Sequence, residues 1–142
     1  MIEVCAAAVR DAEGRVLVAR RTRPAHLQGL WEFPGGKLEP GEDGAACLKR
    51  ELDEELRLDV VVGGALAEAV EKRADGGGLR LTVYASRPVD VVAPRAEPVD
   101  GTHDRIRWVH GDELESLELA PLDRPLVSAV RAFLDAPDDH LP

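Results

Sequence analysis

The chain is poor in cysteine and contains no long apolar run. Its two cysteines, Cys5 and Cys47, lie among apolar or Ala-rich neighbours, so we interpret both as small core residues and expect no disulfide framework. No stretch of 18 apolar residues occurs, and the N-terminus lacks a basic start followed by an apolar segment. The sequence therefore predicts a cytoplasmic protein with no membrane partner.

Basic residues are also scarce. The 142 residues include 18 Lys and Arg against 27 Asp and Glu, which gives a formal net charge of -9. Because a nucleic-acid backbone binds to basic patches, we expect no nucleic-acid polymer as a partner. A small phosphorylated substrate is compatible with this charge if metal ions supply the positive charge. The length predicts a single domain over residues 1–142 and leaves a monomer or a homodimer open.

Helix and strand signals alternate along the chain. Apolar runs over 2–10 and 15–21 flank a short Asp/Gly turn and predict a hairpin. Residues 59–73 predict a strand with a bend, and 79–89 predict its hairpin partner. The other expected elements are a short strand at 30–33, a loop at 93–104, a strand at 105–109, a helical turn at 110–117, an amphipathic helix at 121–134 and a frayed tail at about 137–142.

What the sequence does have is a strongly acidic segment, and we expect a helix in it from about residue 43 to 56. Each residue turns a helix by roughly 100°, so Glu51, Glu54 and Glu55 would share one face. Like charges on one face destabilise a helix, which indicates a cationic partner there. Mg²⁺, which prefers oxygen ligands and substrate phosphates, is the expected cofactor, with Mn²⁺ as an alternative. A solvated helix face is the other interpretation of E-x-x-E-E.

A glycine-rich segment precedes this helix. Pro34, Gly35 and Gly36 are followed by a Pro-Gly pair at 40–41, so we expect a tight loop with exposed backbone groups. From Gly36 onward the sequence has the form G-x5-E-x7-R-E-L-x-E-E-x-R-L. It resembles the Nudix box, G-x5-E-x7-R-E-U-x-E-E-x-G-U with U a bulky aliphatic residue, at every specified position except that Arg57 replaces glycine.

The resemblance implies a Nudix-type α/β/α sandwich with a mixed β-sheet, an α+β fold that the order of expected elements also favours. It implies hydrolysis of a nucleoside diphosphate linked to another moiety, with Mg²⁺ neutralising the developing charge. The implied metal ligands are the carboxylates of Glu51, Glu54 and Glu55 and the carbonyl of Gly35. Those three glutamates would be catalytic, and Arg50 would orient them. An ion pair with Glu54 on the helix surface is the alternative for Arg50.

Two further positions of the box have a structural interpretation. The glycine of the family pattern follows the helix and can take a left-handed conformation, which costs another residue roughly 1 kcal/mol. We therefore expect a local adjustment at Arg57 that leaves the carboxylates in place. Glu42 would be a supporting acid near the helix start, where the helix dipole favours a negative charge in any case.

The resemblance also implies substrate-binding residues outside the box. In MutT-like members an Asn or Asp that opens the last helix reads the nucleobase, and this place falls on Asp123; N-capping is the alternative. Arg21 and His26 match polar positions near the nucleotide, and Phe33 matches an apolar pocket position, with surface or core packing as the alternative for each. An ionised Asp123 would favour the cytosine amine over a guanine O6, and protonation would reverse that preference.

One acidic residue of the MutT-like pattern is missing. It lies in the loop before the strand that carries Trp108, and Thr102 stands at that position here. Asp100, His103 and Asp104 are the candidates to replace it, so the sequence leaves the general base open, although one of the box glutamates is expected to suffice.

These features predict a Mg²⁺-dependent nucleoside triphosphate pyrophosphohydrolase that releases a nucleoside monophosphate and pyrophosphate. Two substrate classes compete: CTP, dCTP or a modified dCTP, and an oxidised purine nucleotide such as 8-oxo-dGTP. A Nudix hydrolase of another nucleoside diphosphate derivative, such as ADP-ribose, is one alternative. A non-catalytic Nudix module that binds a nucleotide is the other.

Overall fold

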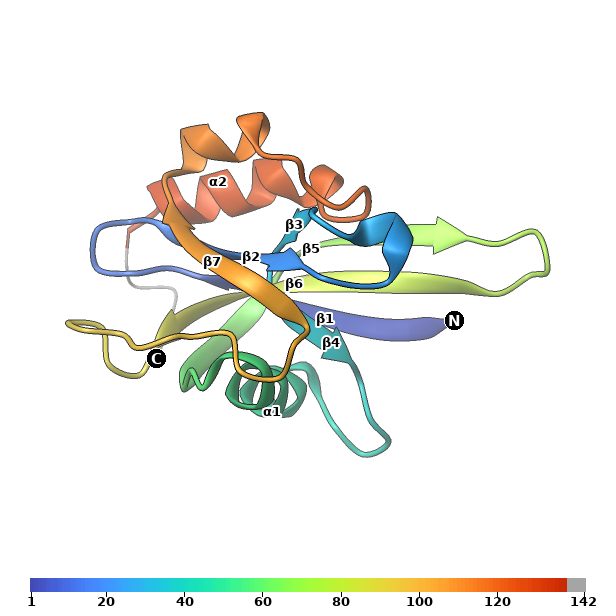
Figure 1. Ribbon diagram of the computed structural model, residues 1–142, viewed down its shortest axis with the longest axis horizontal. Helices are drawn as coiled ribbons and strands as arrows, with labels where there is room; N and C mark the ends of the chain where they lie inside the picture. Colours follow the sequence, from blue (N-terminus) through green and yellow to red (C-terminus); the bar gives the residue numbers. More distant parts are fainter. Residues whose placement is uncertain (138–142) are drawn as a thin grey trace.

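The computed structural model describes residues 1–137, which form two β-sheets between two α-helices (Figure 1). One sheet has the order β4-β1-β6-β5 and consists of β1 (Ile2–Val9), β4 (Gly35–Lys37), β5 (Val60–Lys72) and β6 (Gly78–Pro88). The other has the order β3-β2-β7 and consists of β2 (Val16–Arg21), β3 (Trp31–Glu32) and β7 (His103–Val109). The helices are α1 (Gly44–Leu56) and α2 (Val127–Asp135), and 3-10 turns lie at Ala25–Leu27, Gly111–Ser116 and Arg124–Leu126.

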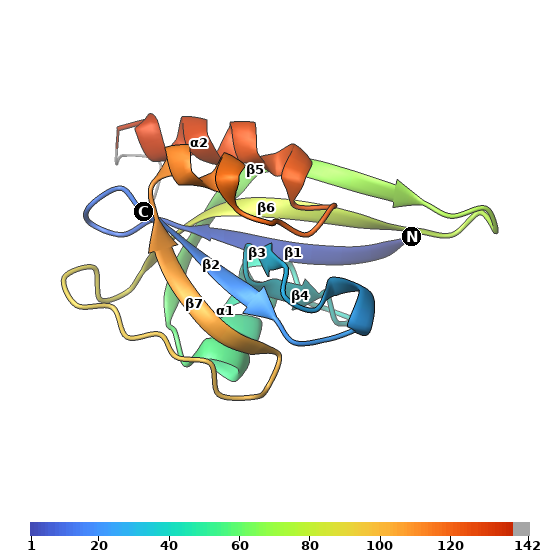
Figure 2. The ribbon, with the colours of Figure 1, turned by 45° about the horizontal axis from the view of Figure 1, so that its top comes forward.

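The predicted mixed α+β sandwich is confirmed. Figures 1 and 2 show α1 on one side of the strands and α2 on the opposite side. The larger sheet is mixed, because β1 pairs parallel with β6 and antiparallel with β4. In residues 1–137, no helix has both the length and the apolar character needed to span a membrane.

The predicted hairpin between residues 2–10 and 15–21 is wrong in its pairing. A tight turn joins the two strands, but after one bridge between Arg10 and Val16 they separate into different sheets. The reason is visible in the burial pattern, because both strands are buried at successive positions instead of alternating ones. A strand covered on both faces has an apolar run without alternation, so this run does not identify its neighbour. β1 and β2 each become the middle strand of a sheet.

These two strands separate two hydrophobic cores. One core lies under α2 and includes Val18, Phe33 and Phe133. The other lies under α1 and includes Leu48 and Leu52. Alternate residues of β1 and β2 contribute to each core, which fixes α1 and α2 on opposite sides of the strands.

The two cysteines are buried free thiols in the core under α1, as predicted. Burial raises the pKa of Cys5, and it raises that of Cys47 to about 12. Both side chains therefore remain thiols near neutral pH and act as small core residues.

The other predicted elements are present with shifted ends. β5 and β6 form the predicted hairpin, and the predicted bend appears as register shifts between Val62 and Ala67. β7 begins at His103, two residues before the expected start at 105. The C-terminal helix begins later than predicted, because a 3-10 turn containing Pro125 precedes α2. Most of the predicted frayed tail, from residue 138 on, lies outside the described residues.

Candidate active site

The acidic segment forms α1, and the predicted helix over residues 43–56 is confirmed. Asp43 is its N-cap, and Asp43 Oδ1 accepts a 2.8 Å hydrogen bond from the Ala46 N–H. Leu48, Leu52 and Leu56 are fully buried at helical spacing, so they dock the helix against the strands. Because this apolar stripe fixes the rotation of α1, it also fixes where the acidic side chains lie.

α1 ends at Arg57, which takes the left-handed conformation itself. Its φ of 53° and ψ of 34° make it the one non-glycine residue with positive φ in the described chain. The Arg57 N–H donates to the Asp53 carbonyl at 3.0 Å, and the Leu58 N–H donates to the Leu52 carbonyl at 3.2 Å. The helix therefore ends as it would with glycine, at a backbone cost of about 1 kcal/mol.

The glycine-rich segment is not wholly the loop that we expected. Gly35 and Gly36 belong to the short edge strand β4, which pairs with Ala6 and Cys5 of β1. A Cβ atom at Gly35 would overlap the Cys5 carbonyl, and one at Gly36 would overlap the Glu51 carboxylate. These glycines thus permit a close approach of three elements, and the turn follows at residues 40–41.

Arg50 organises the outer part of the acidic face. Its Nε and Nη2 donate to the two carboxylate oxygens of Glu42 at 2.7 and 2.9 Å. Its Nη1 donates to Glu51 Oε1 at 2.8 Å and contacts Glu54 Oε2 at 3.4 Å. The hydrogen bonds from Arg50 lower the pKa of Glu42 to about 2. The surface pair with Glu54 is therefore the weakest of these contacts, and Arg50 mainly holds Glu42 and Glu51.

Glu55 has a different environment from the other box glutamates. Glu55 is 7% exposed, and its Oε2 has no hydrogen-bond partner. Burial, the contact with Glu51 and the negative charges of Glu32 and Asp100 together raise the pKa of Glu55 to about 9. The Glu54 side chain, in contrast, is 56% exposed. The acidic face thus runs from a buried carboxyl to a solvated one.

This donor set fits a hard divalent cation. In the described part of the chain, no three Asp, Glu, His or Cys side chains are gathered closely enough to hold a metal ion as they lie. However, all the candidate ligands are oxygens, and a buried carboxylate oxygen of Glu55 is unpartnered. The positive charge among Glu42, Glu51 and Glu54 is supplied by Arg50. The face is therefore suited to a cation, but its ligands must move closer to bind one.

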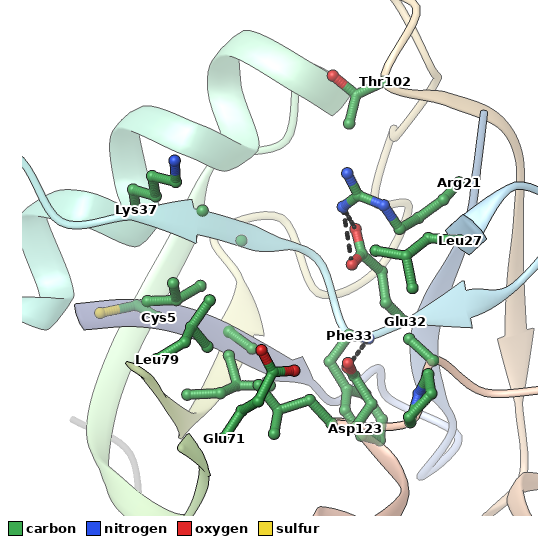
Figure 3. Close-up of a pocket in the computed structure, with 18 of the residues that line it drawn as sticks. Cys5, Arg21, Leu27, Glu32, Phe33, Lys37, Glu71, Leu79, Thr102 and Asp123 are labelled. Atoms are coloured by element: carbon green, nitrogen blue, oxygen red, sulfur yellow. Dashed lines mark hydrogen bonds and ion pairs between the residues drawn. The ribbon is translucent and has the colours of Figure 1, made fainter. Parts of the chain in front are cut away.

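A pocket of about 670 Å³ begins at this face. Glu51 and Glu55 line it together with Gly35, and so do all four residues predicted to bind the substrate, Arg21, His26, Phe33 and Asp123. Figure 3 shows side chains from both sheets and from the loops around the cavity. The residues that line this one pocket therefore come from distant parts of the sequence, between positions 4 and 123.

Asp123 lines the pocket beside Phe33. Its Oδ2 accepts a 2.9 Å hydrogen bond from the Phe33 N–H, drawn in Figure 3. Asp123 stands at the N-cap position of the 3-10 turn Arg124–Leu126, as the alternative interpretation predicted, but its side chain makes no capping hydrogen bond. The residue is 4% exposed, and burial, with a smaller effect from the Glu32 charge, raises the pKa of Asp123 to about 8. At neutral pH this carboxyl is mainly protonated.

Glu32 is a central residue of the pocket that the sequence analysis missed. Arg21 Nη1 donates to both Glu32 carboxylate oxygens at 3.0 Å, and His103 Nε2 lies 2.8 Å from Glu32 Oε2. The one available signal was a charged residue between the buried aromatic residues Trp31 and Phe33. Glu32 therefore links Arg21, which is predicted to bind the substrate, to His103 at the start of β7.

The structure separates the candidates for the missing loop acid. Asp104 pairs with Arg20 at 2.8 Å on an exposed surface and does not line the pocket. Asp100 accepts a hydrogen bond from the Thr102 N–H, and its charge acts on Glu55. His103 is buried beside Glu55. None of the three candidates lines the pocket, although Thr102 does. Asp104 pairs with Arg20 away from the acidic face, whereas Asp100 and His103 are close enough to act on Glu55.

Comparisons with known proteins agree with this geometry. A family model described as the NUDIX domain matches residues 1–130. The chain is 34% identical over 133 residues to the CTP pyrophosphohydrolase of Escherichia coli K12, covering 94% of this chain and 93% of that protein. It is 36% identical over 144 residues to the putative 8-oxo-dGTP diphosphatase 2 of Mycobacterium tuberculosis, covering 98% and 95%.

A solved structure is also similar over most of the chain. The crystal structure of a MutT NUDIX hydrolase from Burkholderia pseudomallei matches with a TM-score of 0.74 and 26% identity, covering 91% of this chain and 97% of that one. The similarity of sequence to the two relatives, and of the arrangement of elements to the solved structure, thus extends along nearly the full length of these proteins.

Proposed function

Because the chain belongs to the Nudix family of phosphoric anhydride hydrolases, we propose that it is a Mg²⁺-dependent nucleoside triphosphate pyrophosphohydrolase. It converts a nucleoside triphosphate and water to the nucleoside monophosphate and pyrophosphate. The observation that supports this most is the single pocket, which joins the acidic face of α1 to a buried, neutral carboxyl at Asp123. One end suits a cation with phosphates, and the other suits an uncharged base.

At the acidic end, the carboxylates of Glu51, Glu54 and Glu55 and the Gly35 carbonyl would hold the metal ion. When bound, Mg²⁺ neutralises charge on the phosphates during water attack. Arg50 keeps Glu51 oriented through its 2.8 Å contact, and Glu42 fixes Arg50 from the other side. We assign proton removal from water to one of the box glutamates, because Glu51 and Glu55 line the pocket and Asp100, His103 and Asp104 do not.

At the other end, Asp123 reads the base while Arg21, His26 and Phe33 line the nucleotide space. A protonated carboxyl offers one donor and one acceptor. A protonated Asp123 can donate to a guanine O6, which is the preference expected above for the protonated form. The pairing edge of cytosine also places an acceptor beside a donor, so a neutral Asp123 can pair with both substrate classes. CTP, dCTP or a modified dCTP and 8-oxo-dGTP are accordingly the substrates that we propose, in line with the names of the two relatives.

A nucleotide panel tests this proposal. Wild-type protein with Mg²⁺ is given CTP, dCTP, 5-methyl-dCTP, 8-oxo-dGTP and ADP-ribose. Released nucleoside monophosphate is measured for all five, and released pyrophosphate for the four triphosphates. We expect pyrophosphate from at least one triphosphate, and loss of release in Glu54→Gln with nucleotide binding retained. Cleavage of ADP-ribose alone would establish the other hydrolase class. Binding without release from any nucleotide would leave a non-catalytic module.

A further inference from the structure

His103 connects the two sides of the pocket. It is the first residue of β7, and its side chain is 0% exposed. Its Nε2 lies 2.8 Å from Glu32 Oε2 in β3, and its Nδ1 lies 3.9 Å from Glu55 Oε2 in α1. Each ring nitrogen therefore has one carboxylate as its neighbour, and the two carboxylates belong to different walls of the pocket.

The contact on the α1 side is incomplete. Glu55 Oε2 and His103 Nδ1 both lack a hydrogen-bond partner, and in the described chain Arg80 Nε is the one other buried side-chain atom in this state. Buried polar atoms are normally bonded, whereas these two face each other at a distance too long for a hydrogen bond. A small movement of the Glu55 carboxyl would close this gap.

The other side of the ring is firmly held. Arg21 Nη1 binds both oxygens of Glu32, and Glu32 in turn fixes His103 through Nε2. Because one nitrogen is fixed in this way, the ring presents the other nitrogen to Glu55 at a defined place. Thr102 and Asp104, the neighbours of His103, have no comparable contact with α1, since Asp104 pairs with Arg20.

We propose that His103 is a positioning residue: its Nε2–H donates to Glu32, and its Nδ1–H donates to the Glu55 carboxylate and so fixes the orientation of that carboxylate when the acidic face binds its divalent cation. Residues that orient a metal ligand from behind commonly change metal affinity without contacting the metal. His103 thereby supports the acidic face from the residue next to Thr102, which stands where the MutT-like pattern has an acid. This inference rests on the proposed function only for the identity of the cation, because its central readout is metal binding.

Two substitutions separate positioning from a purely structural role. A glutamine amide nitrogen replaces Nε2 most closely, and an asparagine amide nitrogen replaces Nδ1. His103→Gln therefore keeps the contact to Glu32 and loses the one to Glu55, whereas His103→Asn does the reverse. Asp104→Asn is the matched control in the same strand, because it removes a charge whose partner, Arg20, lies outside the pocket.

Mn²⁺ and Mg²⁺ affinity is measured by titration calorimetry without nucleotide, together with thermal unfolding in a chelator. In His103→Gln we expect metal affinity to fall about tenfold to a hundredfold, with kcat falling and KM and unfolding temperature nearly unchanged. His103→Asn should keep a metal affinity closer to that of the wild type and unfold at a lower temperature. Asp104→Asn should bind metal as the wild type does.

Wild-type metal affinity in His103→Gln, or a loss of stability alone in both variants, would overturn the proposal and leave His103 as a link between β7 and β3. Absence of any cation uptake by the wild type would overturn it as well. If the wild type binds the cation but releases no pyrophosphate, the proposed function fails. The calorimetric comparison of the variants then still decides whether His103 positions Glu55.

Discussion

Glu55 and Asp123 are two buried carboxyls at different ends of one pocket, and their surroundings differ. Burial is the main cause that raises both pKa values, to about 9 for Glu55 and about 8 for Asp123. Asp123 accepts a hydrogen bond from the Phe33 N–H, whereas Glu55 has an unpartnered oxygen beside other acids. The same burial thus gives a partnered neutral acid at one end and an unsatisfied acid at the other.

Glu42 shows what a cation does to a carboxylate of the same box. Its two hydrogen bonds from Arg50 lower its pKa to about 2, which is opposite in direction to the shift of Glu55. A divalent cation near Glu55 would act on that carboxyl in the same direction. The opposite shifts of Glu42 and Glu55 therefore follow from a side-chain cation, Arg50, which is the largest cause of the shift at Glu42, whereas burial is the largest cause at Glu55.

The largest expected effect comes from Glu55→Gln. Loss of a metal-held charge costs several kcal/mol of transition-state stabilisation, so we expect pyrophosphate release to fall at least roughly a hundredfold. Stability in a chelator should not decrease, because an unpaired buried acid is removed. Asp53→Asn, which removes an exposed acid from the same helix, is the control. Full activity in Glu55→Gln would show that Glu55 is not a metal ligand.

Gly36→Ala disturbs the acidic end without changing any charge. Its Cβ would overlap the Glu51 carboxylate, so that side chain must move. We expect metal affinity measured by calorimetry to fall about tenfold, since displaced support of a metal site commonly costs this much. Gly64→Ala is the matched control, because a Cβ at Gly64 meets no atom within 4 Å. Equal metal affinities in the two variants would mean that metal binding does not depend on the position of the Glu51 carboxylate.

Asp123→Asn tests the neutral end through pH. The folded pKa of Asp123 is raised from 3.8 to about 8, so between these values the folded chain keeps a proton that the unfolded chain loses. The stability from this group is complete below pH 3.8 and is lost as pH rises to about 8. Asn does not titrate. As pH rises through this window, the free energy of unfolding of the variant should therefore increase relative to that of the wild type, by at most about 1.4 kcal/mol per pH unit.

Denaturant unfolding of both proteins across this pH window measures that difference. The amide oxygen of Asn can still accept the Phe33 N–H, so the fold is expected to persist. Parallel stability curves for wild type and variant would mean that Asp123 is ionised throughout, and the contrast with Glu55 would disappear.

The smallest effect separates the stability of α1 from its chemistry. Arg57→Gly removes the cost of a left-handed arginine and should raise the free energy of unfolding by about 1 kcal/mol, with pyrophosphate release unchanged. Arg57→Ala removes the exposed 3.7 Å contact with Asp53 but keeps the unfavourable φ, so it should give no such gain. An equal gain in both variants would attribute the effect to charge instead of backbone.

Local features of the acidic segment could be predicted from the sequence. The rotation of α1 and its acidic face follow from residue spacing, and the N-cap at Asp43 follows from residue type. The box thereby identified the carboxylates Glu51, Glu54 and Glu55 without knowledge of any distant contact. The hairpin of β5 and β6 was equally accessible, because one turn joins two strands.

Contacts between distant residues could not be predicted in this way. The bond from Phe33 to Asp123 spans 90 positions, and the contact of Glu32 with His103 spans 71. Both depend on how two sheets and a loop meet, which no local pattern contains. The pairing of β1 was missed for the same reason, since an apolar run reveals burial on two faces but not the identity of the neighbour.

The parallel pairing of β1 with β6 has a consequence for synthesis on the ribosome. Residues 2–9 leave the ribosome well before residues 79–86, which are their main partners. A nascent chain that ends before β6 offers β1 only the three paired residues of β4. β1 must therefore wait, as an apolar segment with open backbone groups, until β6 has also left the exit tunnel.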